Sequence, residues 1–439
     1  MMLRILSAWN GLKASFWFIP MLFIALSLLG AVGAITLDAA VDLEPEGVLR
    51  YLLPGDVDSA RGVLSTISGA MIGVAGTVFS ITLVALTLAN SQFGSHLLRN
   101  FMHDRTNQVV LGSYISTFVY SLTVLNVIDD SDGDTFIPVV SVLVAMIAAV
   151  ANIFLLIVFI HHIAMSIQAD HVVSDVSSTL SKNLDTYFPE DAGEDSRVLS
   201  DEEVEGRRRG YLQKADIGTL KDGYIQYIDY DALMAAAEDR GLLIDVRFRP
   251  GDHVVKGDRV LTVFSGEELA DDAISMLQQI WIVGRTRTAY QDPEFSIHQM
   301  VEVALRALSP GINDPYTAMT CIDNLASAMC ELTTVRFPSP HRFDGQGELR
   351  ITADVLDFEG MLGAAFNQVR QNAEGSPSVI IRLMEALVTI GSFARNDEQR
   401  RAVRKHARMV LRSAERTIKE ESDLQDLKDR SALLFAESQ

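Results

Sequence analysis

Long apolar runs separated by short polar segments dominate the first third of the chain. Four of these runs are long enough to cross a bilayer, which takes roughly 20 residues. They cover about residues 14–37, 63–89, 109–128 and 136–163. The pattern therefore predicts a transmembrane domain of four helices over residues 1–166.

The second run differs from the other three because small polar residues recur in it at helical spacing. One face of the expected helix collects Gly69, Gly73, Gly76, Ser80, Thr87 and Ser91, is interrupted only by Val84, and has Asn90 near its end. Small residues let helices pack closely in lipid, within one bundle or between subunits. The sharper alternative is a pore wall. The run has no ionisable residue, which argues against a pump more than against a channel.

The charges of the connecting segments predict the orientation. Acidic residues outnumber basic ones between the first and second runs, and DDSDGD, from residue 129, has no basic residue at all. Basic residues lie before the first run and after the second, at Arg4, Lys13, Arg99 and Arg105. Since basic loops remain cytoplasmic, we expect both termini of the chain in the cytoplasm.

After the fourth run the pattern becomes that of a water-soluble protein. Residues 167–209 indicate a helical extension and an acidic linker, and residues 210–265 a small β module with breaks at Pro250-Gly251 and Gly257-Asp258. The module resembles half of a barrel-sandwich domain, but it lacks the Met-Lys-Met hairpin of carrier proteins. We take it as structural, with a small-ligand pocket as the alternative.

Residues 266–439 have mainly helical periodicity. Helices are expected at about 267–290, 296–307, 315–331, 358–372, 378–395, 398–421 and 423–435, with a loop or hairpin around residues 336–352. The predicted fold class is therefore an integral membrane bundle of four helices joined to a cytosolic α+β region.

The segment LSPGINDPYTA, residues 308–318, separates two of these helices. Pro310 and Gly311 end the first helix, Asn313 or Asp314 can cap the second, and Pro315 suits its first turn. The whole turn comprises Ser309, Pro310, Gly311, Asn313, Asp314, Pro315 and Tyr316. The turn alone explains these residues. An anion or partner bound at the helix N-terminus is the alternative.

The expected helix from residue 398 has a basic face opposite its apolar one. That face contains Arg401, Lys405, Arg408, Arg412 and Arg416. A charged stripe of this kind is usually a solvated surface. The alternative is contact with anionic lipid or with an acidic partner.

Composition excludes several classes of function. The formal net charge of −20 disfavours nucleic acid as a partner, because the phosphates would be repelled. The two cysteines, Cys321 and Cys330, match neither a metal site nor a disulfide framework. Asp292, His298, Asn313 and Asp314 could converge, but the sequence has no known catalytic, phosphate-binding or zinc motif. We expect no enzymatic activity, no cofactor and no metal.

Four separated motifs also carry a resemblance to a known family. In chain order they are FSITLVALTLANSQF, DGYIQYIDYDALM, RPGDHVVKGDRVL and ALSPGINDPYTA. Together they resemble the bacterial predicted-membrane-protein family of unknown function 2254. The resemblance implies a bacterial inner-membrane protein with several N-terminal spans and a cytosolic domain. It implies no catalytic residues.

Two functional hypotheses follow. The first is a homo-oligomeric channel or pore lined by the second span, with an ion or small molecule as permeant and the cytosolic domain as its assembly or gating element. The second is a membrane-anchored scaffold or sensor whose cytosolic domain binds a partner, lipid or small ligand. The small-residue face favours the first by a small margin.

Overall fold

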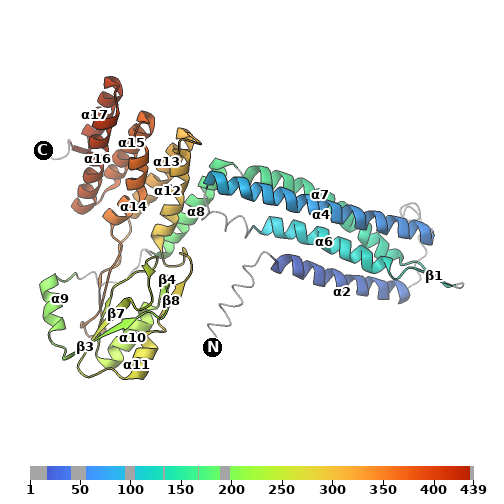
Figure 1. Ribbon diagram of the computed structural model, residues 1–439, viewed down its shortest axis with the longest axis horizontal. Coiled ribbons are helices and arrows are strands. Elements are labelled where there is room, and N and C mark those ends of the chain that lie inside the picture. The colour runs from blue at the N-terminus through green and yellow to red at the C-terminus, as the bar shows by residue number, and fades with distance from the viewer. Residues whose placement is uncertain are drawn as a thin grey trace. The chain divides into compact units, whose positions relative to one another are not determined.

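The structure of the chain is a computed structural model. It describes residues 17–40, 56–93, 104–131, 134–166, 168–187 and 198–435. The chain divides into two compact units, Met1–His171 and Val172–Gln439, called here the first and second units (Figure 1). Residues 14–16 of the first expected span and residues 190–197 of the expected linker lie outside the described residues.

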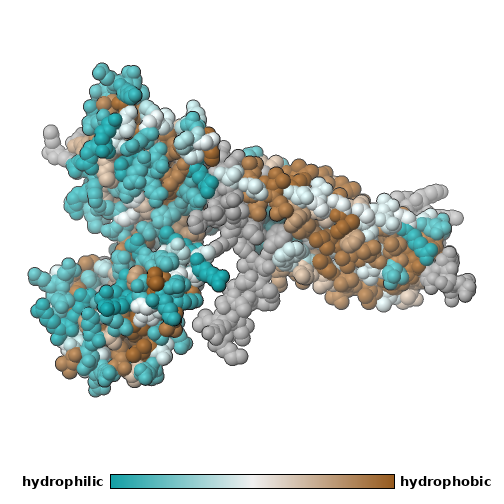
Figure 2. All heavy atoms as spheres, viewed as in Figure 1, coloured by the Kyte–Doolittle hydropathy of each residue, from teal (hydrophilic) through white to brown (hydrophobic). Residues whose placement is uncertain are grey.

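The described part of the first unit contains four long apolar helices. These are α2 (Phe18–Ala40), α4 (Val57–Phe93), α6 (Arg105–Leu125) and α7 (Val139–Ser166), with the short hairpin β1 (Asp129–Ser131) and β2 (Asp134–Phe136) between the last two. All four have the length and composition of membrane spans, as the sequence predicts. Hydrophobic residues dominate their surface (Figure 2). The most buried helix is α6, which packs against the other three.

A buried polar network joins α6 to α7. The Asn152 side chain accepts a hydrogen bond from Ser113 Oγ at 2.7 Å and donates one to Thr117 Oγ1 at 2.8 Å. Tyr114 Oη donates to the Asn152 carbonyl at 2.6 Å. Because polar groups buried in lipid must be satisfied inside the protein, these bonds fix the register of the two helices.

Carboxylates hold the ends of the membrane helices. Asp38, near the end of α2, accepts hydrogen bonds from the backbone N–H groups of Val140 at 2.8 Å and Ser141 at 2.9 Å. This bond pair caps the N-terminus of α7, where the helix dipole favours negative charge. At the opposite end of α7, His162 pairs with Asp104, the N-cap of α6. The ends of α2, α6 and α7 are therefore tied together.

Two sheets form the β part of the second unit. Its strands are β3 (Gln213–Gly218), β4 (Gly223–Ile228), β5 (Leu243–Val246), β6 (His253–Val254), β7 (Arg259–Ser265), β8 (Trp281–Gly284), β9 (His341–Phe343) and β10 (Leu349–Ala353). The strand orders are β3-β7-β5-β10-β9 and β6-β4-β8, and only the β5–β10 pair is parallel. The barrel-sandwich form of the expected module is not confirmed.

One expected helix is partly wrong. The stretch 267–290 contains only the short helix α11 (Asp271–Leu277), and then β8 pairs with β4. Trp281 and Val283 are buried while Ile282 between them is exposed, so the chain alternates as a strand does. Since β8, β9 and β10 join the sheets, the β structure draws on residues well beyond 265.

The remaining helices complete the second unit, and the first of them begins at the end of the first unit. They are α8 (Ala169–Tyr187), α9 (Asp201–Arg208), α10 (Tyr230–Arg240), α12 (Pro293–Ala307), α13 (Pro315–Leu332), α14 (Phe358–Asn372), α15 (Pro377–Phe393), α16 (Asp397–Thr417) and α17 (Glu421–Phe435). Helices α12 to α17 pack on one another through their apolar faces, and α10 packs beside β10. The six expected helices from residue 296 onward are present, and residues 341–353 form the expected hairpin.

Candidate functional site

The small polar residues of α4 face away from their own bundle. Gly69, Gly73, Gly76, Ser80, Thr87 and Ser91 are all exposed in the first unit. The described buried positions of α4 are Val57, Ala60, Leu64, Ser68, Met71, Ala75, Val78, Ala85 and Ala89. At 100° per residue the two sets lie on opposite sides of the helix. We call the exposed set the α4 outer face. Asn90 directly precedes Ser91 in α4, and its side chain is outside the described part.

The glycines of the outer face make no close contact with the described residues. A Cβ added at Gly69, Gly73 or Gly76 meets no described atom within 4 Å. Gly112 of α6 is different, because a Cβ there would lie 3.1 Å from the Cα of Pro20 in α2. Close helix contact inside the bundle therefore uses Gly112, and the glycines of α4 leave open space on its outer side.

The hydroxyl groups of the outer face donate to their own helix. Ser80 Oγ bonds the Gly76 carbonyl at 2.9 Å, and Thr87 Oγ1 bonds the Leu83 carbonyl at 2.9 Å. Each donor is satisfied without a partner helix, while the oxygen lone pairs stay available to accept a hydrogen bond or contact a cation. The face is thus polar at its surface and carries no charge.

Other outward surfaces of the first unit are strongly apolar. Helix α7 exposes Ile147, Ile153, Phe154 and Ile157, and α2 exposes Leu22, Leu26 and Leu29. Such surfaces suit contact with lipid chains. Within α4, large exposed side chains such as Ile72 and Phe79 flank the outer face, and Val84, 69% exposed, interrupts it. The outer face is therefore a polar strip on a lipophilic surface.

The LSPGINDPYTA segment forms a tight turn between α12 and α13. Asp314 is the N-cap of α13 and accepts hydrogen bonds from Thr317 N at 3.1 Å and Thr317 Oγ1 at 2.6 Å. Asn313 has φ +50, in the left-handed region that Asn tolerates. Pro315 occupies the first turn of the helix and Tyr316 is exposed. Ser309 donates to the Arg306 carbonyl at the end of α12, and Pro310 and Gly311 are exposed.

The basic face of α16 lies on the surface, as its spacing suggests. Lys405 pairs with Glu359 of α14, Arg408 lies 5.5 Å from the ring centre of Phe435, and Arg416 donates to the carbonyl of Arg412. Arg401 and Arg412 are exposed and form no ion pair with the described residues. Part of this face is therefore used inside the unit, and part remains accessible.

A buried charged cluster lies where the β part meets the start of α12. Arg287 bonds Asp292 at 2.7 Å and His298 Nδ1 at 3.1 Å. Beside them, Arg249 pairs with Glu294 at 3.2 Å. Asp292 and His298 are two of the four residues named above as candidates for convergence. Both contact Arg287, which joins them. Asn313 and Asp314 lie beyond the other end of α12 and take no part.

Burial controls the protonation of this cluster. Asp292 is 2% exposed, and burial raises its pKa despite the ion pair with Arg287. Burial likewise raises the pKa of Glu294, against the opposing effect of Arg249. Burial, with the two arginines, lowers the pKa of His298 to about 4. His298 is therefore neutral at pH 7 and accepts the Arg287 hydrogen bond at Nδ1.

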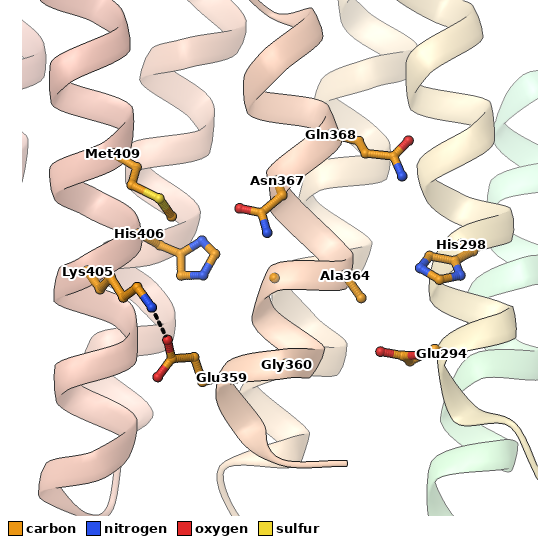
Figure 3. A pocket seen from close by; sticks show the side chains of 11 residues that line it. Glu294, His298, Glu359, Gly360, Ala364, Asn367, Gln368, Lys405, His406 and Met409 are labelled. Carbon is orange, nitrogen blue, oxygen red and sulfur yellow. Dashed lines mark hydrogen bonds and ion pairs between the residues drawn. The ribbon is translucent and has the colours of Figure 1, made fainter. Parts of the chain in front are cut away.

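A groove runs from this cluster across α14 to α16. Its volume is about 530 Å³, and its polar lining includes Glu294, His298, Asn367, Gln368 and His406, with Gly360 and Gly363 in α14 (Figure 3). Burial lowers the pKa of His406 to about 4. The Glu359–Lys405 ion pair closes one side (Figure 3). The groove offers neutral hydrogen-bonding groups beside paired charges, and no group of three metal-ligating side chains within the described chain.

Comparison with known proteins identifies the family of the chain. The family described as "Predicted membrane protein (DUF2254)" matches residues 13–389. The chain belongs to this family. It is also 32% identical over 421 residues to the uncharacterized proteins Rv1290c of Mycobacterium tuberculosis and Mb1321c of Mycobacterium bovis, covering 94% of this chain and 78% of each relative. No solved structure matches.

Two of the motifs that indicate the family meet at the charged cluster. Arg249, from RPGDHVV, pairs with Glu294, and Gly251 lies directly against Asp292 and Arg287. Ile228, from DGYIQYI, exchanges backbone hydrogen bonds with the side chain of Gln291, at 2.7 and 3.0 Å. Sequence reasoning missed Arg249, Arg287 and Glu294. The signal in the sequence was the run QDPEF, in which Asp292 and Glu294 flank Pro293.

Proposed function

We propose that this membrane protein forms a homo-oligomeric channel or pore in the bacterial inner membrane, with the α4 outer face lining the conduit. The observation that carries the proposal is the position of that face, which is polar and uncharged yet points away from its own bundle. An uncharged lining of hydroxyls and glycine backbone lets ions or small solutes pass without binding them tightly.

The contrast among the outward surfaces supports an oligomer. A surface of large apolar side chains, as on α2 and α7, gains nothing by leaving lipid. Exposed glycines present backbone, and their small size lets a second helix approach closely. A ring of subunits would place the apolar flanks, such as Ile72 and Phe79, between neighbours and the hydroxyls of Ser80 and Thr87 toward the axis.

Flux through reconstituted protein tests the proposal. Liposomes containing the full chain are expected to release trapped K⁺ or Cl⁻ faster than empty liposomes. In a variant with both native cysteines replaced by alanine, Ser80→Cys is expected to make this flux sensitive to a charged, membrane-impermeant thiol reagent. The reason is that Ser80 would line the aqueous path, where the reagent can reach it.

Phe154→Cys is the matched control. Phe154 is exposed on the lipophilic surface of α7, so its modification is expected to leave flux unchanged. Absence of flux together with a monomeric particle in native mass spectrometry would refute the proposal. Equal sensitivity of Ser80→Cys and Phe154→Cys would refute the assignment of α4 as the lining.

A separate observation favours a second function, that of a membrane-anchored sensor. The second unit has a cavity of about 530 Å³ lined by several tyrosines. This volume lies in the range of small-molecule sites, about 300–1,000 Å³. Binding there would be independent of any flux through the first unit.

A further inference from the structure

The tyrosine-lined cavity lies beside the charged cluster in the second unit. Four tyrosines line it, from four separate segments: Tyr187 at the end of α8, Tyr227 in β4, Tyr230 at the start of α10 and Tyr290 before α12. Two arginines, Arg249 and Arg342, and one carboxylate, that of Asp354, also line it. Tyr227 and Tyr230 share the motif DGYIQYIDYDALM, whereas Tyr187, Tyr290 and Arg342 come from distant parts of the chain.

The tyrosines provide flat apolar surfaces with polar edges. The rings of Tyr227 and Tyr290 meet edge to face, with centres 5.6 Å apart and planes at 61°. Tyr290 is 73% exposed, so it stands at the rim. Burial raises the pKa of Tyr187 to about 12, which keeps its hydroxyl protonated and able to donate a hydrogen bond. These surfaces suit a planar ring, which stacks on or packs edgewise against tyrosine.

The two arginines differ in how their charge is balanced. Arg249 is neutralised, because it pairs with Glu294 at 3.2 Å and with Asp354 at 3.8 Å. Arg342 stacks on the Tyr230 ring, with its guanidinium carbon 3.9 Å from the ring centre. Among the described residues, Arg342 has no carboxylate within ion-pair distance. Its pKa is lowered by burial, the sign of a guanidinium that has lost water.

The unusual feature is a half-buried guanidinium that no carboxylate of the described residues pairs; the charge of Asp231 acts on it from beyond ion-pair distance. Arg side chains in such positions are suited to carboxylate or phosphate, which they bind through two parallel N–H bonds. Contact with Tyr230 covers one face of the guanidinium, so two parallel N–H bonds to a ligand would form along its edge. A cationic ligand is disfavoured, because it would meet the charge of Arg342.

We propose that this cavity binds a small aromatic anion, meaning a planar ring that carries a carboxylate or phosphate group. Arg342 holds the anionic group, and the tyrosines enclose the ring. The site is separate from the pore proposed for α4. It rests on the second proposed function, that of a membrane-anchored sensor, and specifies the chemical class of its ligand. Failure of binding here would leave the flux measurement unaffected.

Equilibrium dialysis of the full chain in nanodiscs tests the site. Adenosine monophosphate and salicylate serve as radiolabelled probes, so that a phosphate and a carboxylate source are distinguished. At least one is expected to bind with Kd below about 1 mM, the weak end for a ligand of this size. Arg342→Gln is expected to weaken binding roughly 10-fold or more, because a charge-assisted hydrogen bond is lost. Uncharged adenosine and benzamide are expected to bind more weakly than the probes.

Matched variants separate the site from general damage. Tyr290→Ala is expected to weaken binding, whereas Tyr316→Ala, at a tyrosine of similar exposure (77%) in the α12–α13 turn, is not. Arg401→Gln, at an exposed arginine of α16, is the control for Arg342→Gln. Tyr290 is at the rim of the cavity, so Tyr290→Ala is expected to leave the fold intact. This variant therefore still tests the site if Arg342→Gln fails to fold. Absence of binding by both probes at 1 mM, or equal binding by Tyr290→Ala and the wild type, would overturn the proposal.

Discussion

Gly251 adopts φ +100 in the turn between β5 and β6, with its Cα against the carboxylate of Asp292. An added Cβ would overlap Asp292 Oδ2, lie 2.7 Å from its Cγ and lie 3.0 Å from a guanidinium nitrogen of Arg287. The absence of a side chain therefore serves two purposes at this position. It permits the backbone conformation, and it makes room for the charged cluster.

Gly251→Ala is accordingly expected to lower the free energy of unfolding of the second unit by more than the cost of the backbone conformation alone. The matched control is Gly257→Ala, at φ +93, where an added Cβ meets no described atom. Both variants carry a strain of about 1–3 kcal/mol. Only the first also displaces a buried ion pair, which adds on the order of 1–3 kcal/mol. The melting temperature of the full chain in detergent checks this difference, and equal values for the two variants would contradict it.

At the scale of whole elements, the two sides of α4 have different surroundings. Its buried side packs on α6 and α7, and a Cβ added at the glycines of its outer face meets no described atom within 4 Å. Glycines therefore matter for different reasons in α4 and α6. In α6, Gly112 allows contact with α2, while in α4 Gly73 leaves open space among the described residues.

This difference predicts that a Gly→Val substitution acts on stability in α6 and on self-association in α4. Gly112→Val is expected to lower the melting temperature of the monomer, because its side chain would collide with Pro20 and Phe23 of α2. Gly73→Val is expected to leave the monomer as stable as the wild type and to weaken self-association, since it enlarges the outer face. Melting curves and native mass spectrometry measure the two effects. A Gly73→Val chain that unfolds early while remaining monomeric would contradict this division of roles.

Elements with strong local constraints were predictable from the sequence. The four spans follow from the length that a bilayer imposes, and α14 lies at 358–372, where its apolar spacing predicts it. The stretch 267–290 was not predictable as α11 and β8, because a four-residue strand leaves little periodicity and its partner, β4, is distant in the sequence. The capping of α13 by Asp314 depends only on neighbouring residues, and the pattern NDP indicates it.

At the scale of the molecule, the sites of the second unit are assembled from distant segments. The charged cluster needs Arg249 to meet Glu294, and the cavity needs Tyr187, Tyr230 and Arg342 to surround one space. No periodicity or spacing relates these positions, so only the folded chain brings them together. The orientation of the chain, in contrast, is a prediction that rests on loop charges alone, which are local features of the sequence.

The loop charges predict that the β1–β2 hairpin is outside the cytoplasm and that α16 is inside. In a chain whose two native cysteines are replaced by alanine, Thr135→Cys in β2 is expected to react with a membrane-impermeant maleimide in intact spheroplasts. Arg412→Cys, at an exposed position of α16, is expected to react only after lysis. The reason is that the acidic segment around the hairpin crosses the membrane more readily than the basic segment between α4 and α6. Labelling of Arg412→Cys in intact spheroplasts, with protection of Thr135→Cys, would invert the topology and place the second unit, with its tyrosine-lined cavity, outside the cytoplasm.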